Sequence, residues 1–506
     1  MKILSVEQTR NADAYTIKHE PISSIDLMER AAAALAQWIV QHYPLPCPVV
    51  HIVAATGNNG GDGLCVARLL RNLHYSVEVS IVQLPHASPD FLHNEMLLTK
   101  KDNPAAGSCK TINTIDDLSF CPQSLIIDAL FGSGLRRPLE GLVAAVVEKI
   151  NLQNHCCTII AIDLPSGLYA DGTSAEQGRA IVRAHHTISF ELPKLAFMLP
   201  ENHPFVGEWH TVPIGLHKEF IDKQSVFNYY FTHQEALKRQ KKSPKFAHKG
   251  THGHVLFVGG SYGKMGAAVM SVKAALKAGA GLVSAYLPRC GYVVMQVAVP
   301  EAMVIASPQA AEHHLSATDA MPALSLYQVL ALGPGMGMQP QTQALVRELL
   351  LAATVQKIPT IIDADALNAI AANSWQHLLP PNAILTPHPK EFERLAGASD
   401  NHFQRLEKLR YCARQWHCYI VLKGAHTATA CPDGRVFFNS SGNPSMATGG
   451  SGDILTGIIA ALLAQGYTPE DSALLGVFRH GTAGDRAAAR QSHYNSISAL
   501  DIIDSL

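Results

Sequence analysis

Residues 446–457, which read MATGGSGDILTG, place four glycines and one carboxylate directly before a long apolar run. A Gly-rich loop that opens a helix can hold a phosphate through its backbone N–H groups and the helix dipole. No lysine follows the glycines, so this is not the GxxxxGK[ST] loop of P-loop NTPases. The site suits an anion, yet it contains Asp453, a negative charge, and the residues alone leave the role of that carboxylate open.

A second Gly-rich stretch, GNNGGDG at residues 57–63, lies between a strand-like and a helix-like run. It is not GxGxxG, and the acid at the usual distance, Glu78, lies inside a strand-like run, so a standard dinucleotide fingerprint is missing. The glycines permit close backbone approach to a ligand phosphate, and Asn58, Asn59 and Asp62 add side-chain oxygens. A tight strand–helix turn without a ligand is the alternative.

Two further strand ends carry polar groups. IIDALFGSGLRRP (residues 126–138) offers Asp128, and AIDLPSGL (residues 161–168) offers Asp163 and Ser166. Asn59, Asp128 and Ser166 are oxygen donors only, and such donors suit a hard cation. One carboxylate among neutral oxygens favours a weakly held monovalent ion, although the residues alone leave this open. From the residues alone, Asp163 could be a capping or structural carboxylate.

These motifs need elements that position them, and the pattern predicts two α/β domains. The domain boundary lies within residues 218–250, which are rich in Lys and Arg, so we expect domains at 1–225 and 226–506. The basic run KRQKK (238–242) is expected to be a solvated linker. In the first half, helices are expected at 25–42 and 64–73, and strands at 48–56, 76–84, 124–132 and 157–167. In the second half a helix is expected at 267–280, and strands at 254–260, 282–288, 326–335, 359–367, 383–389 and 418–430.

The composition argues against nucleic-acid-binding, secreted and membrane proteins. The 506 residues carry a net charge of -1 and 47% hydrophobic residues, which argues against a nucleic-acid-binding surface. The ten cysteines and 25 histidines form no common metal-binding spacing, so free thiols in a reducing cytosol are expected. The amino terminus turns polar too early for a signal peptide, and no apolar run of about 18 residues suggests a membrane span. We expect a cytoplasmic protein without membrane or nucleic-acid partners.

Taken together, the motifs resemble a known family. GNNGGDG, IDALFGSGL and AIDLPSGL resemble, in order and spacing, the N-terminal epimerase half of the bifunctional NAD(P)H-hydrate repair enzymes. VGGS, ALGPGMG, IIDADALN, LTPHPKEFERL, VLKGAHT and the GSGD loop resemble the ribokinase-like dehydratase half of the same family. The resemblance covers most of residues 1–215 and nearly all of 245–490. It implies a Rossmann-like N-terminal domain and a ribokinase-like, doubly wound C-terminal domain.

For the N-terminal half, the resemblance implies interconversion of the R and S epimers of hydrated NAD(P)H at C6. Asp163 would bind at the reacting ring and move a proton. Potassium would be ligated by Asn59, Asp128 and Ser166. The remaining implied contacts to the hydrated nucleotide are Asn58, Asn59, Gly60, Gly61, Asp62, Gly132, Ser133, Gly134, Leu135, Arg136, Arg137 and Pro138.

For the C-terminal half, the resemblance implies dehydration of the S form to NAD(P)H, with ADP giving AMP and phosphate. Asp453 would take the proton of the C6 hydroxyl while the loop backbone faces the phosphoryl group. Magnesium is expected with the nucleotide. Ala267, Gly335 and His388 would contact the hydrate, or else serve packing and loop rigidity. The implied contacts to the adenine nucleotide are Lys423, Gly424, Ala425, His426, Thr427 and Gly452.

Two alternatives stay open at this point. The first is a ribokinase-like kinase for a vitamin or thiazole alcohol, fused to a nucleotide-binding module, which would release a stable phosphorylated product. The second is a nucleotide-sensing or protein-binding module without catalysis in the first half. The fused arrangement of the two halves favours ADP as phosphoryl donor and leaves ATP open, and the residues do not distinguish NADH hydrate from NADPH hydrate. A homo-oligomer is expected, because paired nucleotide domains often self-associate.

Overall fold

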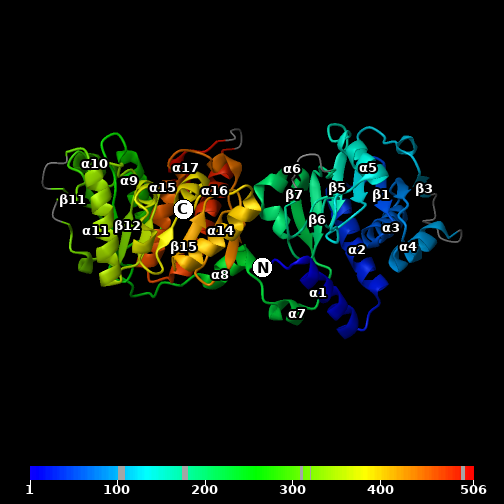
Figure 1. The fold of residues 1–506 in the computed structure, drawn as a ribbon, viewed down its shortest axis with the longest axis horizontal. Coiled ribbons are helices and arrows are strands. Elements are labelled where there is room, and N and C mark those ends of the chain that lie inside the picture. Colours follow the sequence, from blue (N-terminus) through cyan, green and yellow to red (C-terminus); the bar gives the residue numbers. More distant parts are fainter. Residues whose placement is uncertain (101–108, 174–179, 308–311, 319–320, 492–495) are drawn as a thin grey trace. The chain divides into compact units, whose positions relative to one another are not determined.

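The computed structural model describes residues 1–100, 109–173, 180–307, 312–318, 321–491 and 496–506. Contacts divide them into two compact units (Figure 1). The N-terminal unit is Lys2–Val226 with Asn401–Phe403, and the C-terminal unit is Phe227–Asp400 and Gln404–Leu506 with Met1. Each unit has its own sheet covered by helices, so the expected α/β class is confirmed.

The N-terminal unit is built on a parallel sheet with the strand order β3-β2-β1-β4-β5-β6-β7. The order reverses between β1 and β4, as in a Rossmann-like sheet, and ligands of such sheets bind outside the carboxyl ends at that point. The Rossmann-like architecture is therefore confirmed. The strands are β1 (Val50–Ala55), β2 (Val77–Val82), β3 (Cys109–Ile112), β4 (Leu125–Ala129), β5 (Thr158–Ile162), β6 (His186–Phe190) and β7 (Glu208–Val212).

Successive side chains along each strand point to opposite faces of this sheet, and the central strands are mostly apolar, so both faces carry apolar side chains. Ile52 and Ile127 face one core, which packs against α2, α3 and α4. Val53 and Ile126 face the other core, which packs against α5. The helices of the unit are α1 (Val6–His19), α2 (Ser24–His42), α3 (Asn58–Asn72), α4 (Pro89–Thr99), α5 (Gly141–Asn151), α6 (His203–Val206) and α7 (Lys218–Lys223).

The C-terminal unit has a larger sheet in the order β11-β10-β9-β12-β13-β14-β15-β16-β17-β8. Neighbours are parallel except at β16, which is antiparallel to both β15 and β17. The strands are β8 (Asn228–Phe231), β9 (His254–Val258), β10 (Leu282–Leu287), β11 (Met303–Ala306), β12 (Val329–Leu332), β13 (Thr360–Ile362), β14 (Ile384–Leu385), β15 (Tyr419–Leu422), β16 (Ala428–Ala430) and β17 (Val436–Asn439).

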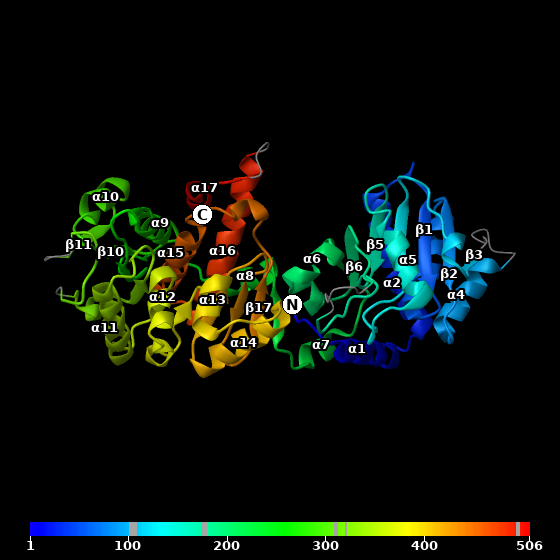
Figure 2. The same ribbon diagram turned by 45° about the horizontal axis from the view of Figure 1, so that its top comes forward.

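Helices cover both faces of this sheet, which makes it doubly wound. Figure 2 shows α11–α14 on one side and α9, α15, α16 and α17 on the other. Helix α15 packs along α9, and both contribute to the core beneath them. The helices are α8 (His233–Arg239), α9 (Met265–Lys277), α10 (Gly291–Ala298), α11 (Pro340–Gln356), α12 (Ala364–Ala372), α13 (Pro389–Ala396), α14 (His402–Gln415), α15 (Ser451–Ala464), α16 (Pro469–Arg490) and α17 (Ala499–Asp504).

Two expectations about local structure were wrong. Residues 58–63 are the first turns of α3 rather than a loop, and the run 418–430 is two antiparallel strands rather than one. The basic run 238–242 is exposed apart from Arg239, as expected of a solvated segment. Arg239, the last residue of α8, is ion-paired with Glu470 and Asp471 at 3.1 and 2.6 Å and so connects α8 to the first turn of α16.

The ten cysteines are free thiols, as expected. Across the described parts of the chain, no helix combines the length and the hydropathy that crossing a bilayer requires.

Candidate active sites

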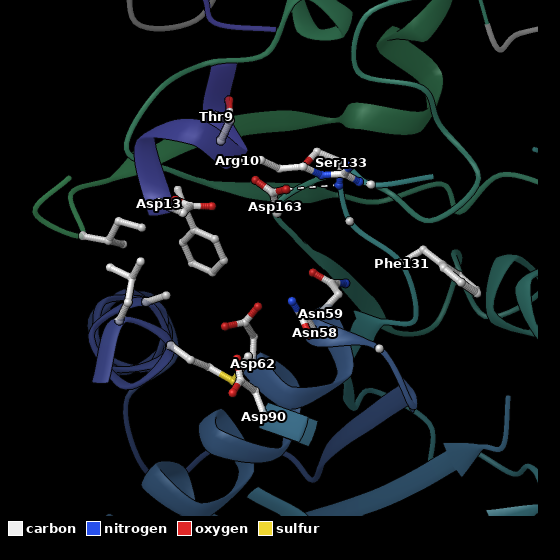
Figure 3. A pocket seen from close by; sticks show the side chains of 18 of the residues that line it. Thr9, Arg10, Asp13, Asn58, Asn59, Asp62, Asp90, Phe131, Ser133 and Asp163 are labelled. Carbon is white, nitrogen blue, oxygen red and sulfur yellow. Dashed lines mark hydrogen bonds between the residues drawn. The ribbon is translucent and has the colours of Figure 1, made fainter. Parts of the chain in front are cut away.

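The N-terminal unit has a cavity of about 480 Å³ at the carboxyl ends of its strands. The residues that follow β1, β4 and β5 line it, and α1 and α2 close one side. Figure 3 shows the carboxylates of Asp13, Asp62 and Asp163 facing the same open space from three different elements. The cavity therefore lies where the order of the strands predicts a ligand site.

Asp163 follows β5 in the left-handed region, with φ at 62°, a conformation uncommon for a residue other than glycine. Its carboxylate is bound on two sides: the Lys194 ammonium lies 3.1 Å from Oδ1, and the Ser133 N–H donates to Oδ2 at 3.2 Å. Burial raises the pKa of Asp163, but Lys194 and Ser133 outweigh burial and hold this pKa below its ordinary value. Asp163 is thus ionised and can accept a proton.

Two other carboxyl groups of the cavity have the opposite shift. Burial raises the pKa of Asp13 to about 6, against the opposing charge of Lys194. Burial, reinforced by Asp163 and Asp13, raises the pKa of Asp62 well above its ordinary value. Near neutral pH this cavity therefore contains an ionised carboxylate beside carboxyl groups that hold protons more readily.

Asp128 and Ser166 are fully buried and bonded to each other below the cavity. The Ser166 hydroxyl donates to Asp128 Oδ1 at 2.6 Å, and the Ser166 N–H donates to Oδ2 at 2.8 Å. Burial raises the pKa of Asp128 to about 6, although the Ser166 bonds oppose the shift. Asn59 lies against Gly132, and its buried Nδ2 has no hydrogen-bond partner among the described residues.

The C-terminal unit has a separate cavity of about 830 Å³, and Asp453 lines it. Gly450 is the N-cap of α15, with φ at 91° and no side-chain hydrogen bond to the first turn. The helix amino terminus is thus open to an anion. Burial raises the pKa of Asp453 to about 7, Asp363 reinforces this, and Lys423 opposes it. Asp453 is therefore poised as a base near neutral pH.

Lys423, at the end of β15, joins the charged groups of this cavity. Its Nζ lies 3.0 Å from Asp363 Oδ1 and 3.9 Å from Glu391 Oε2. The Thr456 hydroxyl donates to the other oxygen of Asp363 at 2.7 Å. Burial lowers the pKa of Lys423, but Asp363 and Glu391 outweigh it and raise the pKa. A permanent positive charge thus lies beside Gly452, at the start of α15.

Two histidines line the same cavity. His388 is the N-cap of α13, where its Nδ1 accepts from the Lys390 and Glu391 N–H groups. The His388 side chain is 44% exposed, and its Nε2 lies 3.4 Å from Glu391 Oε1. His480 lies 3.2 Å from the Ser451 hydroxyl, and burial, with Lys423, lowers the His480 pKa to about 4. Both rings are neutral hydrogen-bonding groups at neutral pH.

Relatives of known type match the chain over its whole length. A family model described as NAD(P)H-hydrate dehydratase matches residues 255–506, and one described as YjeF-related protein N-terminus matches residues 24–196. The bifunctional NAD(P)H-hydrate repair enzyme of Moorella thermoacetica is 36% identical, over 100% of this chain and 96% of that protein. The enzyme of that name from Escherichia coli is 33% identical, over 92% and 85%.

The chain belongs to the family of bifunctional NAD(P)H-hydrate repair enzymes. The family resemblance expected from the motifs is thereby confirmed, and both halves of the chain take part in it. This disfavours a small-molecule kinase fused to an unrelated module. Solved structures with similarity to about half of the chain include a ribokinase-like superfamily protein from Enterococcus faecalis, at 26% identity and a TM-score of 0.48, covering 56% of this chain and 95% of that one.

Within this repair-enzyme chain, most of the residues expected at the two sites lie in two cavities, one in each unit. Around the N-terminal cavity the expected lining residues are Asn58, Asn59, Asp62, Gly132, Ser133, Gly134, Leu135 and Asp163. Around the C-terminal cavity they are His388, Lys423, Gly424, Ala425, Thr427, Gly452 and Asp453.

Other expected residues lie outside both cavity linings. Gly60 and Gly61 pack inward against Ala55 and Met28, whereas Arg136, Arg137 and Pro138 are exposed. Ala267 and Gly335 lie against each other, since a side chain on Gly335 would come within 3.2 Å of Ala267 Cβ. The His426 ring is bonded through Nδ1 to the Asn439 carbonyl at 3.1 Å.

Sequence reasoning missed several polar residues that line the two cavities. Asp13 and Lys194 lie far from the Gly-rich motifs in the sequence. Lys194 is the one charged residue of the apolar run LPKLAFML, and a lysine in such a run could have indicated a functional residue. Asp363 follows β13 directly, as the first acid of DADALN, and was a second usable signal. His480 lies in a helical stretch without a motif, and only the fold brings it to the cavity.

Proposed function

We propose that this chain epimerises hydrated NAD(P)H in its N-terminal domain, residues 1–225, and dehydrates the S form in its C-terminal domain, residues 226–506. The observation that carries the proposal is Asp453, a base with its pKa near neutrality, beside an open helix amino terminus and Lys423. Family membership over the whole chain supports the pairing of two activities.

In the N-terminal cavity, the C6 hydroxyl takes up a proton from a protonated carboxyl group and leaves as water while the ring nitrogen donates its lone pair, and Asp163 accepts the proton released when water adds to the other face. Lys194 keeps Asp163 ionised and fixes its direction, and the Ser133 N–H holds the other oxygen. Asp62, whose pKa burial raises well above its ordinary value, donates a proton to the departing hydroxyl. Asn58, Asn59 and residues 132–135 hold the nucleotide.

Potassium fits the residues beneath this cavity. Asp128 is a buried carboxylate that the described residues contact only through neutral donors, and burial raises its pKa. With Ser166 and Asn59 it would form an oxygen-only donor set, which a large monovalent cation accepts. When bound, the cation would supply charge compensation and order the loop after β4.

In the C-terminal cavity, Asp453 removes the proton from the C6 hydroxyl as that oxygen attacks the terminal phosphoryl group of ADP or ATP. The amino terminus of α15 and Lys423 stabilise the charge on that group. Phosphate then leaves from C6, the ring nitrogen donates its lone pair, and loss of the C5 proton restores the reduced nicotinamide. His388 and residues 424–427 orient the two ligands.

Magnesium fits this cavity as an ion bound mainly by the nucleotide. The carboxylates of Asp363 and Asp453 face the cavity, and Mg²⁺ commonly takes one or two carboxylates together with phosphate oxygens. When bound, the ion neutralises phosphate charge.

The test gives the purified full-length chain hydrated NADH with ADP or ATP and follows the absorbance of reduced nicotinamide. Absorbance should return only when an adenine nucleotide is present, with release of inorganic phosphate. A phosphorylated product that accumulates without this absorbance would instead identify a small-molecule kinase.

Asp453→Asn is the matched variant. It keeps the size of the side chain and removes the base, so dehydration should fall by about 10²- to 10⁴-fold. Nucleotide binding through Lys423 and epimerisation should be retained. Dehydration near the parental rate would assign Asp453 a structural role and exclude this mechanism. We also propose a homo-oligomer, which light scattering of the same preparation tests.

A further inference from the structure

Two histidines and a glutamate gather at the outer edge of the N-terminal sheet, away from the cavity. His186 is the first residue of β6 and pairs in register with Glu208, the first residue of β7. His210 lies two residues further along β7, so its side chain projects from the same face as Glu208. One ligand atom from each of the three residues lies within 4.8 Å of the others.

The distances within this cluster fit an ion better than hydrogen bonds. His186 Nδ1 lies 3.7 Å from Glu208 Oε2, and His210 Nε2 lies 3.7 Å from Glu208 Oε1. Both ring nitrogens are buried and have no hydrogen-bond partner among the described residues. Zinc bonds of 2.0–2.2 Å in tetrahedral geometry separate neighbouring ligand atoms by about 3.3 Å. The three side chains therefore need only a small adjustment to share one ion.

The surroundings keep the two rings in place. The Trp38 ring, on α2, lies 5.4 Å from the His186 ring and 5.2 Å from the His210 ring. Burial lowers the pKa of both histidines, although Glu208 opposes this. The adjacent His185 is used differently, because its Nδ1 accepts from the Ile159 N–H.

We propose that His186, Glu208 and His210 bind one divalent transition-metal ion, with Zn²⁺ as the best fit and water in the fourth position. Two imidazoles and a carboxylate form a donor set that zinc accepts. The ion would join β6 to β7, the edge strand, and so stabilise the outer part of the sheet.

This site is independent of the proposed epimerisation. Phe190, at the other end of β6, lines the cavity, and it lies four residue steps, or about 13 Å, along the strand from His186. Metal binding is therefore expected to alter stability and leave the reaction at Asp163 largely unchanged.

The experiment uses the full-length chain without an affinity tag, after treatment with a chelator. Zn²⁺ is titrated by calorimetry, and Co²⁺ is added as an optical probe, which should quench Trp38 emission and be displaced by Zn²⁺. We expect one equivalent of Zn²⁺ per chain and a higher unfolding temperature with the metal. A parent protein that takes up no Zn²⁺, or that takes it up without saturation, overturns the proposal.

Variants assign the binding to these residues. Glu208→Gln and His210→Gln should each lose the saturable Zn²⁺ site and the quenching by Co²⁺. His203→Gln changes an exposed histidine on α6 and should retain both. The assignment would be overturned by a variant that has the unfolding temperature of the metal-free parent and still binds Zn²⁺ as well as the parent does. If a variant does not fold, the Zn²⁺ stoichiometry of the parent protein still tests the site.

Discussion

Asp163, which is buried, and Asp453, which is half-buried, have opposite shifts in pKa, and the side chains around them explain why. Asp163 has an ammonium group 3.1 Å away, so its charged form is favoured. Asp453 lies among other carboxylates, and Lys423, its nearest cation, is already paired with Asp363. One group is fixed as a carboxylate, and the other changes protonation near neutral pH. This difference makes their pH profiles distinguishable.

Dehydration should depend on pH through Asp453. A base acts only when deprotonated, and burial raises the pKa of Asp453 to about 7. The kcat/KM for dehydration should therefore fall on the acid side, by about tenfold for each pH unit well below 7. The measurement is the rate of NADH return from the S hydrate at saturating nucleotide. A profile that stays flat through this range would show that a different group is the base.

Epimerisation should depend on Lys194. Lys194→Met removes the charge that offsets burial, so the pKa of Asp163 should rise and its ionised fraction should fall. We expect slower epimerisation at neutral pH, with the acid limb of the profile moved to higher pH. Chromatographic separation of the R and S forms, without nucleotide, measures the rate. Lys194→Arg keeps the charge and serves as the control; an unchanged profile in Lys194→Met would exclude this role.

At the scale of elements, the glycines of α3 are required for packing as well as for ligand approach. A Cβ on Gly60 would lie 1.7 Å from the Ala55 carbonyl oxygen, and one on Gly63 would lie 2.5 Å from Ala129 Cβ. The helix amino terminus can thus lie directly on β1 and β4. That contact brings Asn59 and Asp62 to the cavity, so packing and function depend on the same motif.

Gly60→Ala should displace the amino terminus of α3 and destabilise the N-terminal unit, by at least about 1–3 kcal/mol, the usual cost of overpacking. Denaturant unfolding measures the loss, and epimerisation should fall while dehydration persists. Gly57→Ala is the control for stability, because nothing lies within 4 Å of a Cβ there and its φ is ordinary. Equal unfolding of the two variants would contradict the packing argument.

Much of the arrangement of elements was predictable, because buried parallel strands read as continuous apolar runs that end in polar loops. β1, β4, β5 and β9 were found in this way, and so were the loops after them. Short or half-exposed strands such as β3, β7 and β8 lack that signal. Residues 418–430 form two strands because the chain turns between Leu422 and Ala428. The composition of this segment does not distinguish the turn from the interior of a single strand.

The candidate sites were predictable where a motif follows a strand, and not where a group reaches the cavity from another element. Asp163 and Asp453 belong to the first class. Asp13 comes from α1 and His480 from α16, and neither has a local pattern that differs from a solvated helix face. Tertiary packing alone decides that these two side chains face a ligand. The His186, Glu208 and His210 cluster was missed for the same reason, because its ligands come from two strands.

At the scale of the whole molecule, the two cavities lie in separate compact units, and each has its own acid–base group. If the hydrated nucleotide diffuses between them, the two activities need not belong to one chain. Full-length Asp163→Asn should then repair only the S form, apart from spontaneous interconversion, while full-length Asp453→Asn should epimerise without dehydrating.

Mixing these two variants should restore repair of the R form, because each supplies the step that the other lacks. The measurement is NADH return from the purified R hydrate with nucleotide present, for each variant and for the mixture. The rate should rise with the amount of Asp453→Asn until dehydration by Asp163→Asn limits it. Asp163→Asn mixed with itself is the control for protein concentration. A mixture no faster than that control would mean that the substrate must pass between the two sites of a single chain, and free diffusion between the units would be excluded.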